Sequence, residues 1–231
     1  MLALFKAQKK EVLEKLERED PIPGDAKATA ALYLFGRKKW EKTFREFGNE
    51  IIKAAVLANG VRVLSELAVV GISFDIKNPR AVSWIKNKVF RFAYEVNNTT
   101  LNKLRNTLIE ALENGESIKK IAERVEEIFG FAEDYRNEMI ARTEIISATN
   151  YGAYEAIQQS GLVTKKIWIA TIDERTRDTH EAIDGEVVEF EEEFSNGLQF
   201  PGDPDGELDE IINCRCTFGH LFPGDPEYDS N

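Results

Sequence analysis

The sequence has 231 residues and a mass of 26.2 kDa, enough for one large domain or two modest ones with a buried core. Hydrophobic residues make up 42% and charged residues 31%, which argues against a wholly disordered or collagen-like chain. The net charge of -11 is unevenly spread, because residues 161–231 contain 5 basic and 18 acidic side chains while residues 1–160 contain 25 and 23. Since DNA phosphates repel acidic surfaces, any DNA contact is expected in the first part.

No uninterrupted apolar stretch reaches the ~18 residues that a membrane span needs. The longest candidate, residues 51–72, is interrupted by Lys53, Arg62 and Glu66. The N-terminus begins with apolar residues and only then reaches Lys6, which reverses the order of a signal peptide. We therefore expect a soluble protein made in the cytosol, with no membrane partner.

Residues 1–160 have apolar residues at helical spacing. A stripe of apolar residues predicts a first helix, which Pro21–Gly24 is expected to end. A second helix is predicted over residues 26–70, with Asn59–Gly60 as a stop or kink. The residues expected on the first stripe are Leu2, Phe5, Val12, Leu13 and Leu16.

Further helices are expected after a break at residues 71–79. One is predicted over residues 81–95, and residues 97–100 are expected to cap the next. Ser117 is predicted to cap another, and a long helix over residues 133–159 is predicted to end at Ser160–Gly161.

The pattern changes to strands after Gly161. Residues 165–172 are β-rich, Asp184–Gly185 predicts a turn before a strand at residues 186–190, and residues 211–221 form a last structured piece. We predict an α+β protein in which an extended, mainly helical N-terminal part precedes a small α+β unit with a short β-hairpin or small sheet.

The predicted organisation has three parts. Residues 1–73 form a helical N-terminal region, and residues 74–221 form one domain that is helical over 74–160 and contains β-structure over 161–221. Residues 222–231 form a flexible acidic tail.

Cys214 and Cys216 are the only cysteines. A disulfide across one intervening residue meets the required geometry poorly, which leaves either two buried thiols or a metal pair. Two thiolates can bind Zn²⁺, but a structural site needs four ligands. His180, His220 and Asp173 are the candidates to join them, and the sequence leaves both interpretations open.

Polar residues elsewhere also allow two interpretations. His180 is a candidate general base oriented by Asp184 or Asp173, or else this region is a loop fixed by Arg–carboxylate pairs. Arg142 and Glu144 lie two residues apart on a helix, so they point to different sides. Glu144 is either catalytic or part of a buried polar clamp, and we favour the clamp.

Two basic clusters in the helical part are candidates for DNA contact, although interspersed acids favour an ordinary solvated helix face. They are Arg37–Lys39 and the group Lys86, Lys88 and Arg91, with Trp40, Trp84 and Phe90 nearby.

An ordered series of motifs lies between residues 139 and 216: Ala141–Glu144, Lys166–Trp168, Asp173–His180, Ile183–Gly185, Pro201–Pro204 and Ile212–Cys216. This series resembles the phage head-morphogenesis family, the minor head proteins similar to protein F of phage Mu. The positions that match the family's motifs are Arg142, Glu144, Trp168, Asp173, Arg177, His180, Asp184, Gly185, Asn213, Cys214 and Cys216.

The resemblance implies a minor capsid protein of a tailed phage or prophage, present in few copies in the head interior or at the portal vertex. It implies assembly in the host cytoplasm, a role in head assembly and DNA packaging or delivery, and a portal or major capsid protein as partner. DNA is a further candidate partner through the helical part. The resemblance assigns no catalytic residue.

We therefore predict a structural and interaction protein rather than an enzyme. Its polar network is expected to comprise Arg142, Glu144, Trp168, Asp173, Arg177, His180, Asp184 and Asn213. A candidate structural Zn²⁺ site consists of His180, Cys214 and Cys216, with Asp173 or His220 as fourth ligand. The alternatives are a zinc-dependent hydrolase with Glu144 or Asp184 as base, and a DNA-binding module.

Overall fold

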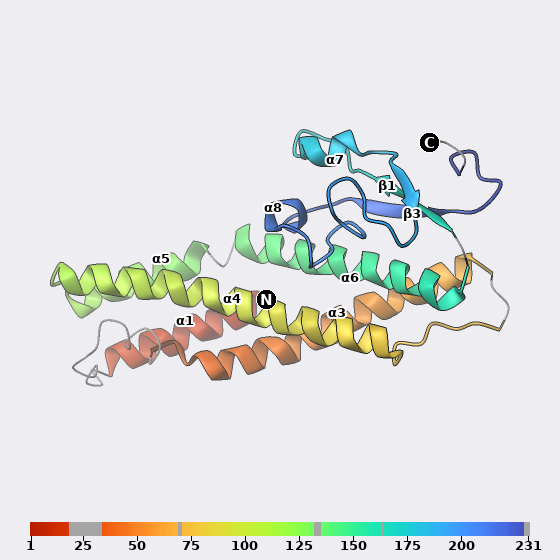
Figure 1. Ribbon diagram of the computed structural model, residues 1–231. Coiled ribbons are helices and arrows are strands. Elements are labelled where there is room, and N and C mark those ends of the chain that lie inside the picture. Colours follow the sequence, from red (N-terminus) through yellow and green to blue (C-terminus); the bar gives the residue numbers. More distant parts are fainter. Residues whose placement is uncertain (19–33, 69–70, 132–134, 163, 229–231) are drawn as a thin grey trace. The chain divides into compact units, whose positions relative to one another are not determined.

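The computed structural model describes every residue except 19–33, 69–70, 132–134, 163 and 229–231 (Figure 1). Its elements are α1 (Leu2–Glu17), α3 (Arg37–Glu66), α4 (Pro79–Glu113), α5 (Ile118–Phe131), α6 (Asn137–Ser160), β1 (Lys165–Ile169), α7 (Asp178–Ala182), β2 (Val187–Glu189), α8 (Leu208–Ile211) and β3 (Thr217–Leu221). The predicted α+β class is confirmed. The predicted helix end at Pro21–Gly24 lies outside the described residues.

The chain forms two compact units, which we describe separately. The first contains Met1–Asn49 and Asn87–Glu138, and the second contains Glu50–Lys86 and Met139–Asn231. The domain boundaries expected from the sequence remain predictions. Among the described residues, no helix combines the length and hydropathy that a membrane span requires.

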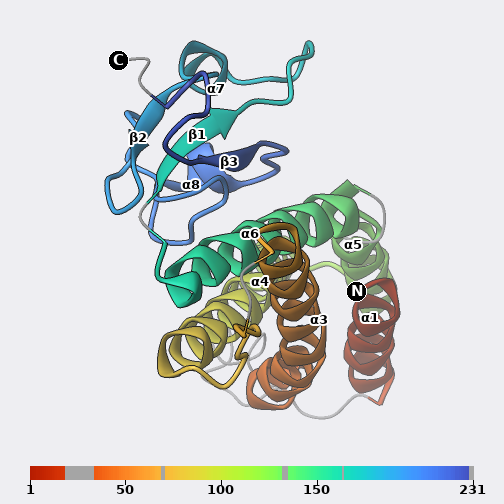
Figure 2. The same ribbon diagram turned by 90° about the vertical axis from the view of Figure 1, so that its right-hand side faces the viewer.

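The first unit is helical, and α1 packs against α5 (Figure 2). Phe5 and Val12 of the predicted α1 stripe are fully buried, whereas Leu2 is exposed. Ser117 caps α5 as predicted, because its Oγ accepts a hydrogen bond from the backbone N–H of Lys120 at 3.3 Å. The buried apolar cluster consists of Val12, Leu16, Leu34, Phe35, Leu101, Leu104, Leu108, Ala111, Ile121, Val125 and Phe129.

The predicted break at residues 97–100 is wrong, since α4 continues from Pro79 to Glu113. Asn97 is buried, donates from Nδ2 to Ala93 O at 2.6 Å and accepts from Gln8 Nε2 at 2.9 Å. Thr100 donates to Val96 O at 3.1 Å. These side chains bond to the preceding turn of their own helix instead of capping a new one.

The sequence predicts a stop or kink at Asn59–Gly60, and the stop is wrong, since α3 continues to Glu66. Asn59 donates from Nδ2 to the Thr149 carbonyl of α6 at 2.6 Å. The missing side chain of Gly60 leaves room for the Phe74 ring, which a Cβ would meet at 2.5 Å. Asn59 and Gly60 therefore lie inside a continuous helix, where each contacts another part of the same unit.

The two basic clusters, which are candidates for DNA contact, are accessible apart from Lys88. Trp40 and Lys88 are buried, with 4% and 6% of their surface exposed. Phe90 is exposed, and the Arg45 guanidinium lies 4.7 Å from its ring centroid. Trp84 stacks on Tyr151 at a centroid distance of 3.9 Å. Trp40 and Trp84 thus pack within the protein while Phe90 stays exposed, and DNA contact remains a prediction.

The second unit carries a three-stranded antiparallel sheet in the order β2-β1-β3 (Figure 2). Ile167 lies opposite Val187 of β2 and Gly219 of β3. Gly185 adopts a φ of 82° in the predicted turn before β2. In both views the strands, α7 and α8 lie on one side of α6 (Figures 1 and 2). The predicted small sheet is therefore confirmed.

We call the part of the second unit that runs from β1 to β3, residues 165–221, the C-terminal lobe. A buried lysine lies in its interior. Lys166 is fully buried, and its Nζ donates to the backbone and side-chain oxygens of Gln199, both at 2.8 Å. The rings of Tyr154, Phe190 and Phe194 surround the ammonium group at 5.1–5.9 Å. Burial lowers the pKa of Lys166 to about 8, against the opposing effect of nearby carboxylates, chiefly Glu191 and Asp203.

The contact between α6 and α3 within the second unit depends on Gly152. A Cβ at this position would meet the Val56 carbonyl oxygen at 2.5 Å, and backbone cannot move aside as a flexible side chain can.

We predict that Gly152→Ala lowers the free energy of unfolding by about 1–3 kcal/mol because of this overlap. Thermal or urea unfolding followed by circular dichroism measures the change. Gly130→Ala in α5 is the matched control, because nothing lies within 4 Å of the added methyl, and it is expected to be neutral or slightly stabilising. Equal effects of the two substitutions would contradict the close approach.

Candidate metal centre

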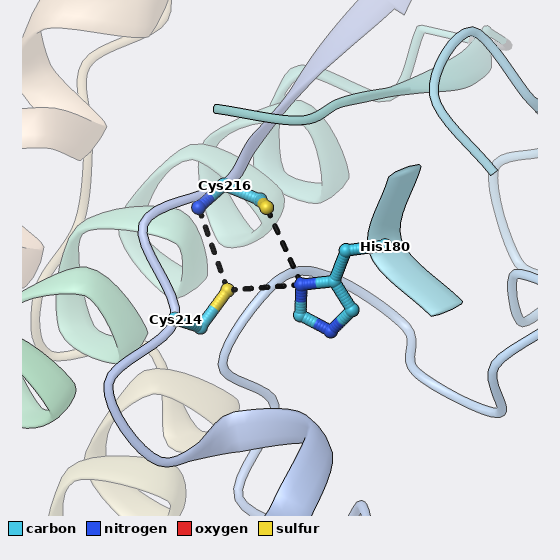
Figure 3. Close-up of side chains that lie close together, drawn as sticks. All are labelled: His180, Cys214 and Cys216. Atoms are coloured by element: carbon cyan, nitrogen blue, oxygen red, sulfur yellow. Dashed lines mark hydrogen bonds between the residues drawn. The ribbon is translucent and has the colours of Figure 1, made fainter. Parts of the chain in front are cut away.

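Three buried side chains from distant parts of the chain converge in the C-terminal lobe (Figure 3). His180 belongs to α7, and Cys214 and Cys216 lie between α8 and β3. The His180 Nδ1 atom lies 3.7 Å from Cys214 Sγ and 3.4 Å from Cys216 Sγ. The backbone N–H of Cys216 also donates to Cys214 Sγ at 3.4 Å. One imidazole nitrogen therefore faces two sulfurs that the loop holds side by side.

The donor set and its spacing fit a zinc ion. Tetrahedral zinc with sulfur at about 2.3 Å and nitrogen at about 2.0 Å places these ligand atoms about 3.5 Å apart. The two nitrogen–sulfur distances lie on either side of this value. Two thiolates and one imidazole also match zinc in ligand softness. His180, Cys214 and Cys216 would therefore hold the ion, which would cross-link α7 to the segment between α8 and β3.

The outer nitrogen of His180 has a carboxylate partner, Glu210 of α8. Its Oε2 atom lies 2.9 Å from His180 Nε2, and the Thr179 hydroxyl donates to both carboxylate oxygens at 3.1 Å. A carboxylate on Nε2 keeps a proton on that nitrogen and leaves Nδ1 free to bind a metal. The sequence analysis missed Glu210, because its place four residues before Cys214 carries no signal for this contact.

The two neighbouring thiols differ in how readily they lose a proton. Hydrogen bonds from Cys214 and His180 lower the pKa of Cys216 well below its usual range, against the opposing effect of burial. The same thiol–thiol bond, together with burial, raises the pKa of Cys214. The lobe therefore favours one thiolate, which is the protonation state a metal ligand needs.

We call residues Glu210–Cys216 the cysteine segment, and side chains of α6 hold its centre. The backbone N–H of Asn213 donates to Thr143 Oγ1 at 2.8 Å, and Arg142 Nη1 donates to Asn213 Oδ1 at 2.5 Å. Asn213 adopts a φ of 62°, a conformation that asparagine tolerates better than most residues. These bonds fix the bend that directs both cysteines toward His180.

The loop after β1 holds the same segment from another side. Arg177 Nη2 donates to the Ile212 carbonyl, and the Thr171 hydroxyl donates to the Arg215 carbonyl at 2.8 Å. Arg215 forms a two-pronged ion pair with Asp173, which holds the pKa of that carboxyl well below its usual range.

Asn150 of α6 anchors the end of the cysteine segment. It is buried, donates from Nδ2 to the carbonyls of Pro201 at 2.8 Å and Cys216 at 3.2 Å, and accepts from Thr217 Oγ1 at 2.9 Å. The sequence analysis missed this residue, because an asparagine in a long helix gives no sign that its amide is buried.

The remaining candidate residues lie outside the cluster of three. Asp173 is paired with Arg215, and His220 lies on β3 opposite Lys166, with its ring 5.6 Å from that of Phe222. Asp184 is exposed and accepts a hydrogen bond from the Ala170 N–H at 2.8 Å.

Two further predicted network residues lie in or near the core. Trp168 is fully buried, and its ring meets the His180 ring edge-on at 5.1 Å. Glu144 is half-buried on α6. The structure thus divides the predicted network into separate pairs, several of which meet at the cysteine segment.

Comparison with known proteins places this arrangement in a family. The family model described as phage Mu protein F like protein matches residues 102–219, which include His180, Cys214, Cys216 and the cysteine segment. This chain belongs to the phage Mu protein F-like family. No solved structure matches it.

Several individual proteins are similar to part of this chain. YqbB of Bacillus subtilis is 27% identical over 80% of this chain and 62% of its own length. Minor head protein GP7 of Bacillus phage SPP1 is 25% identical over 54% of this chain and 42% of its own length. The NAD(+)–arginine ADP-ribosyltransferase EFV of Enterococcus faecalis is 35% identical over 57% of this chain but 28% of its own length. This family member thus spans less than two thirds of each of these relatives.

We predict that the zinc-supplied protein binds one Zn²⁺ per chain, and that His180→Ala or Cys214→Ala abolishes binding because each removes a donor. Both variants are expected to destabilise the lobe while leaving the described helices within residues 26–130 largely intact. Glu210→Gln is expected to weaken affinity about 10–100-fold, since it removes the carboxylate that orients His180. Metal analysis and competition with a chelator measure these effects.

His220→Ala is the matched control, because it removes a histidine that lies outside the cluster. It is expected to retain the metal. Full metal content in Cys214→Ala would contradict the assignment.

Proposed function

We propose that this chain is a minor head protein of a tailed phage or prophage. It associates with the portal vertex and acts in head assembly and in DNA packaging or delivery. The observation that carries the proposal is its family membership together with its similarity to GP7 of Bacillus phage SPP1, which is named as a minor head protein. A portal or major capsid protein is the expected partner, and the phage head is the expected location.

The geometry of the lobe supports a binding role rather than turnover. Side chains that resemble catalytic groups in the sequence have internal partners: Arg142 bonds to Asn213, Asp173 to Arg215, and His180 to Glu210. Such pairs fix the shape of the lobe, and Glu210 leaves Nδ1 of His180 facing the two cysteines. A zinc ion held by the cluster would stabilise this shape further.

The ADP-ribosyltransferase activity in the name of the EFV relative does not support the same activity in this chain. The match covers 28% of that protein, and the name of a whole protein does not locate its activity in the matched part. The hydrolase alternative needs a base beside the metal. Of its two candidates, Asp184 bonds to a backbone N–H in an exposed turn, and Glu144 lies half-buried on α6 outside the cluster of three.

We predict that heads purified from cells producing this protein contain it in a few copies, and that the portal protein is recovered with it after mild cross-linking. Quantitative mass spectrometry of gradient-purified heads measures the copy number. Deletion of its gene is expected to reduce the yield of DNA-filled heads, because the portal vertex lacks one of its components.

The control is complementation with the wild-type gene or with the His220→Ala variant, each of which is expected to restore the yield. A protein that is abundant in the cells but missing from purified heads would overturn the proposal.

A further inference from the structure

A small polar pocket opens beside the metal cluster. His180 and Cys216 form part of its wall, and Arg175, Arg177 and Arg215 form another part. The cavity volume of about 10 Å³ corresponds to roughly one water-sized group. The pocket therefore accepts a single atom or one oxygen of a larger ion next to two of the three metal donors.

The protein itself supplies three donors to the cluster. Among the described residues, no fourth histidine, cysteine or carboxylate joins His180, Cys214 and Cys216. Two nearby carboxylates have other partners. Asp173 pairs with Arg215, and Glu210 bonds to Nε2 of His180 rather than approaching the sulfur atoms. A zinc ion prefers four ligands, which leaves one position to be filled from outside the cluster.

The charge around this position favours an anion. A divalent cation with two thiolates and a neutral imidazole has no net charge, so it does not repel a negative ligand. The residues that line the pocket include three arginines and no acid. Asp173 neutralises Arg215, whereas Arg177 donates to the uncharged Ile212 carbonyl and keeps its full charge. Arg175 is largely exposed, and its Nη2 atom lies 3.9 Å from the Asp173 carboxylate.

We propose that the pocket completes the metal coordination with an exchangeable small inorganic anion, which Arg175 and Arg177 attract. This inference rests on the metal centre proposed above. It distinguishes the centre from a sealed structural site, in which four protein ligands would leave no room for exchange. The centre would then respond to the anions in its surroundings while still cross-linking the lobe.

The test uses the full chain loaded with Co²⁺, whose visible absorption bands report on the ligands around the ion. Azide, chloride and phosphate are titrated separately at constant ionic strength. We expect a saturable change of the bands with at least one anion. Arg175→Gln and Arg177→Gln are each expected to raise the apparent Kd about tenfold, because each removes a charged hydrogen-bond donor.

Arg62→Gln is the matched control, since this exposed arginine of α3 pairs with Glu66 and is absent from the pocket lining. It is expected to leave the anion response unchanged. Arg175→Gln is the safer of the two pocket variants, because Arg177 also supports the cysteine segment.

Two results would overturn the inference while leaving the metal centre standing. One is stoichiometric Co²⁺ binding with bands that no anion alters, and the other is an anion response that both pocket variants retain in full. Failure of the wild-type chain to bind Co²⁺ at all would instead reject the metal centre itself.

Discussion

The C-terminal lobe depends on how the cysteine segment, Glu210–Cys216, is held in place. Helix α6 binds its centre through Arg142 and Thr143, and the loop after β1 binds it through Arg177. These partners lie 35 to 71 residues away along the chain. Because a buried polar group without a partner costs about 1–3 kcal/mol, loss of one contact also penalises the group that remains. The bend that directs both cysteines toward His180 is thus fixed by tertiary contacts.

These contacts preorganise the three side chains of the candidate metal centre. Many small metal sites form only when the ion binds, and the binding free energy then drives folding. Here Glu210 orients His180, and the Cys216 N–H bonds to Cys214 Sγ, so the donors converge through the chain's own contacts. A lobe of fixed shape suits a protein of the phage Mu protein F-like family if its role is to bind neighbouring head components.

Much of the architecture could be predicted from the sequence because hydrophobic period and turn residues act locally. The helices, the strand that follows Gly161, and the turn at Gly185 follow from such signals. The predicted helix boundaries at Asn59 and Asn97 were wrong, since tertiary packing placed polar side chains inside continuous helices. A shared site of His180 and the two cysteines could be proposed from the residue types. The roles of Glu210 and Asn150 depend on contacts with residues far away along the chain, which no local sequence pattern encodes.

The most direct test of this account is amide hydrogen exchange across residues 210–216 in the metal-free protein. If the contacts from α6 and from the loop after β1 hold the segment, its amides are protected before any metal is added. Thr143→Val, which removes the acceptor for the Asn213 N–H, then speeds exchange there and leaves α1 and α5 unchanged. Rapid exchange across the segment in the metal-free wild type, with protection only after Zn²⁺ is added, would contradict the account.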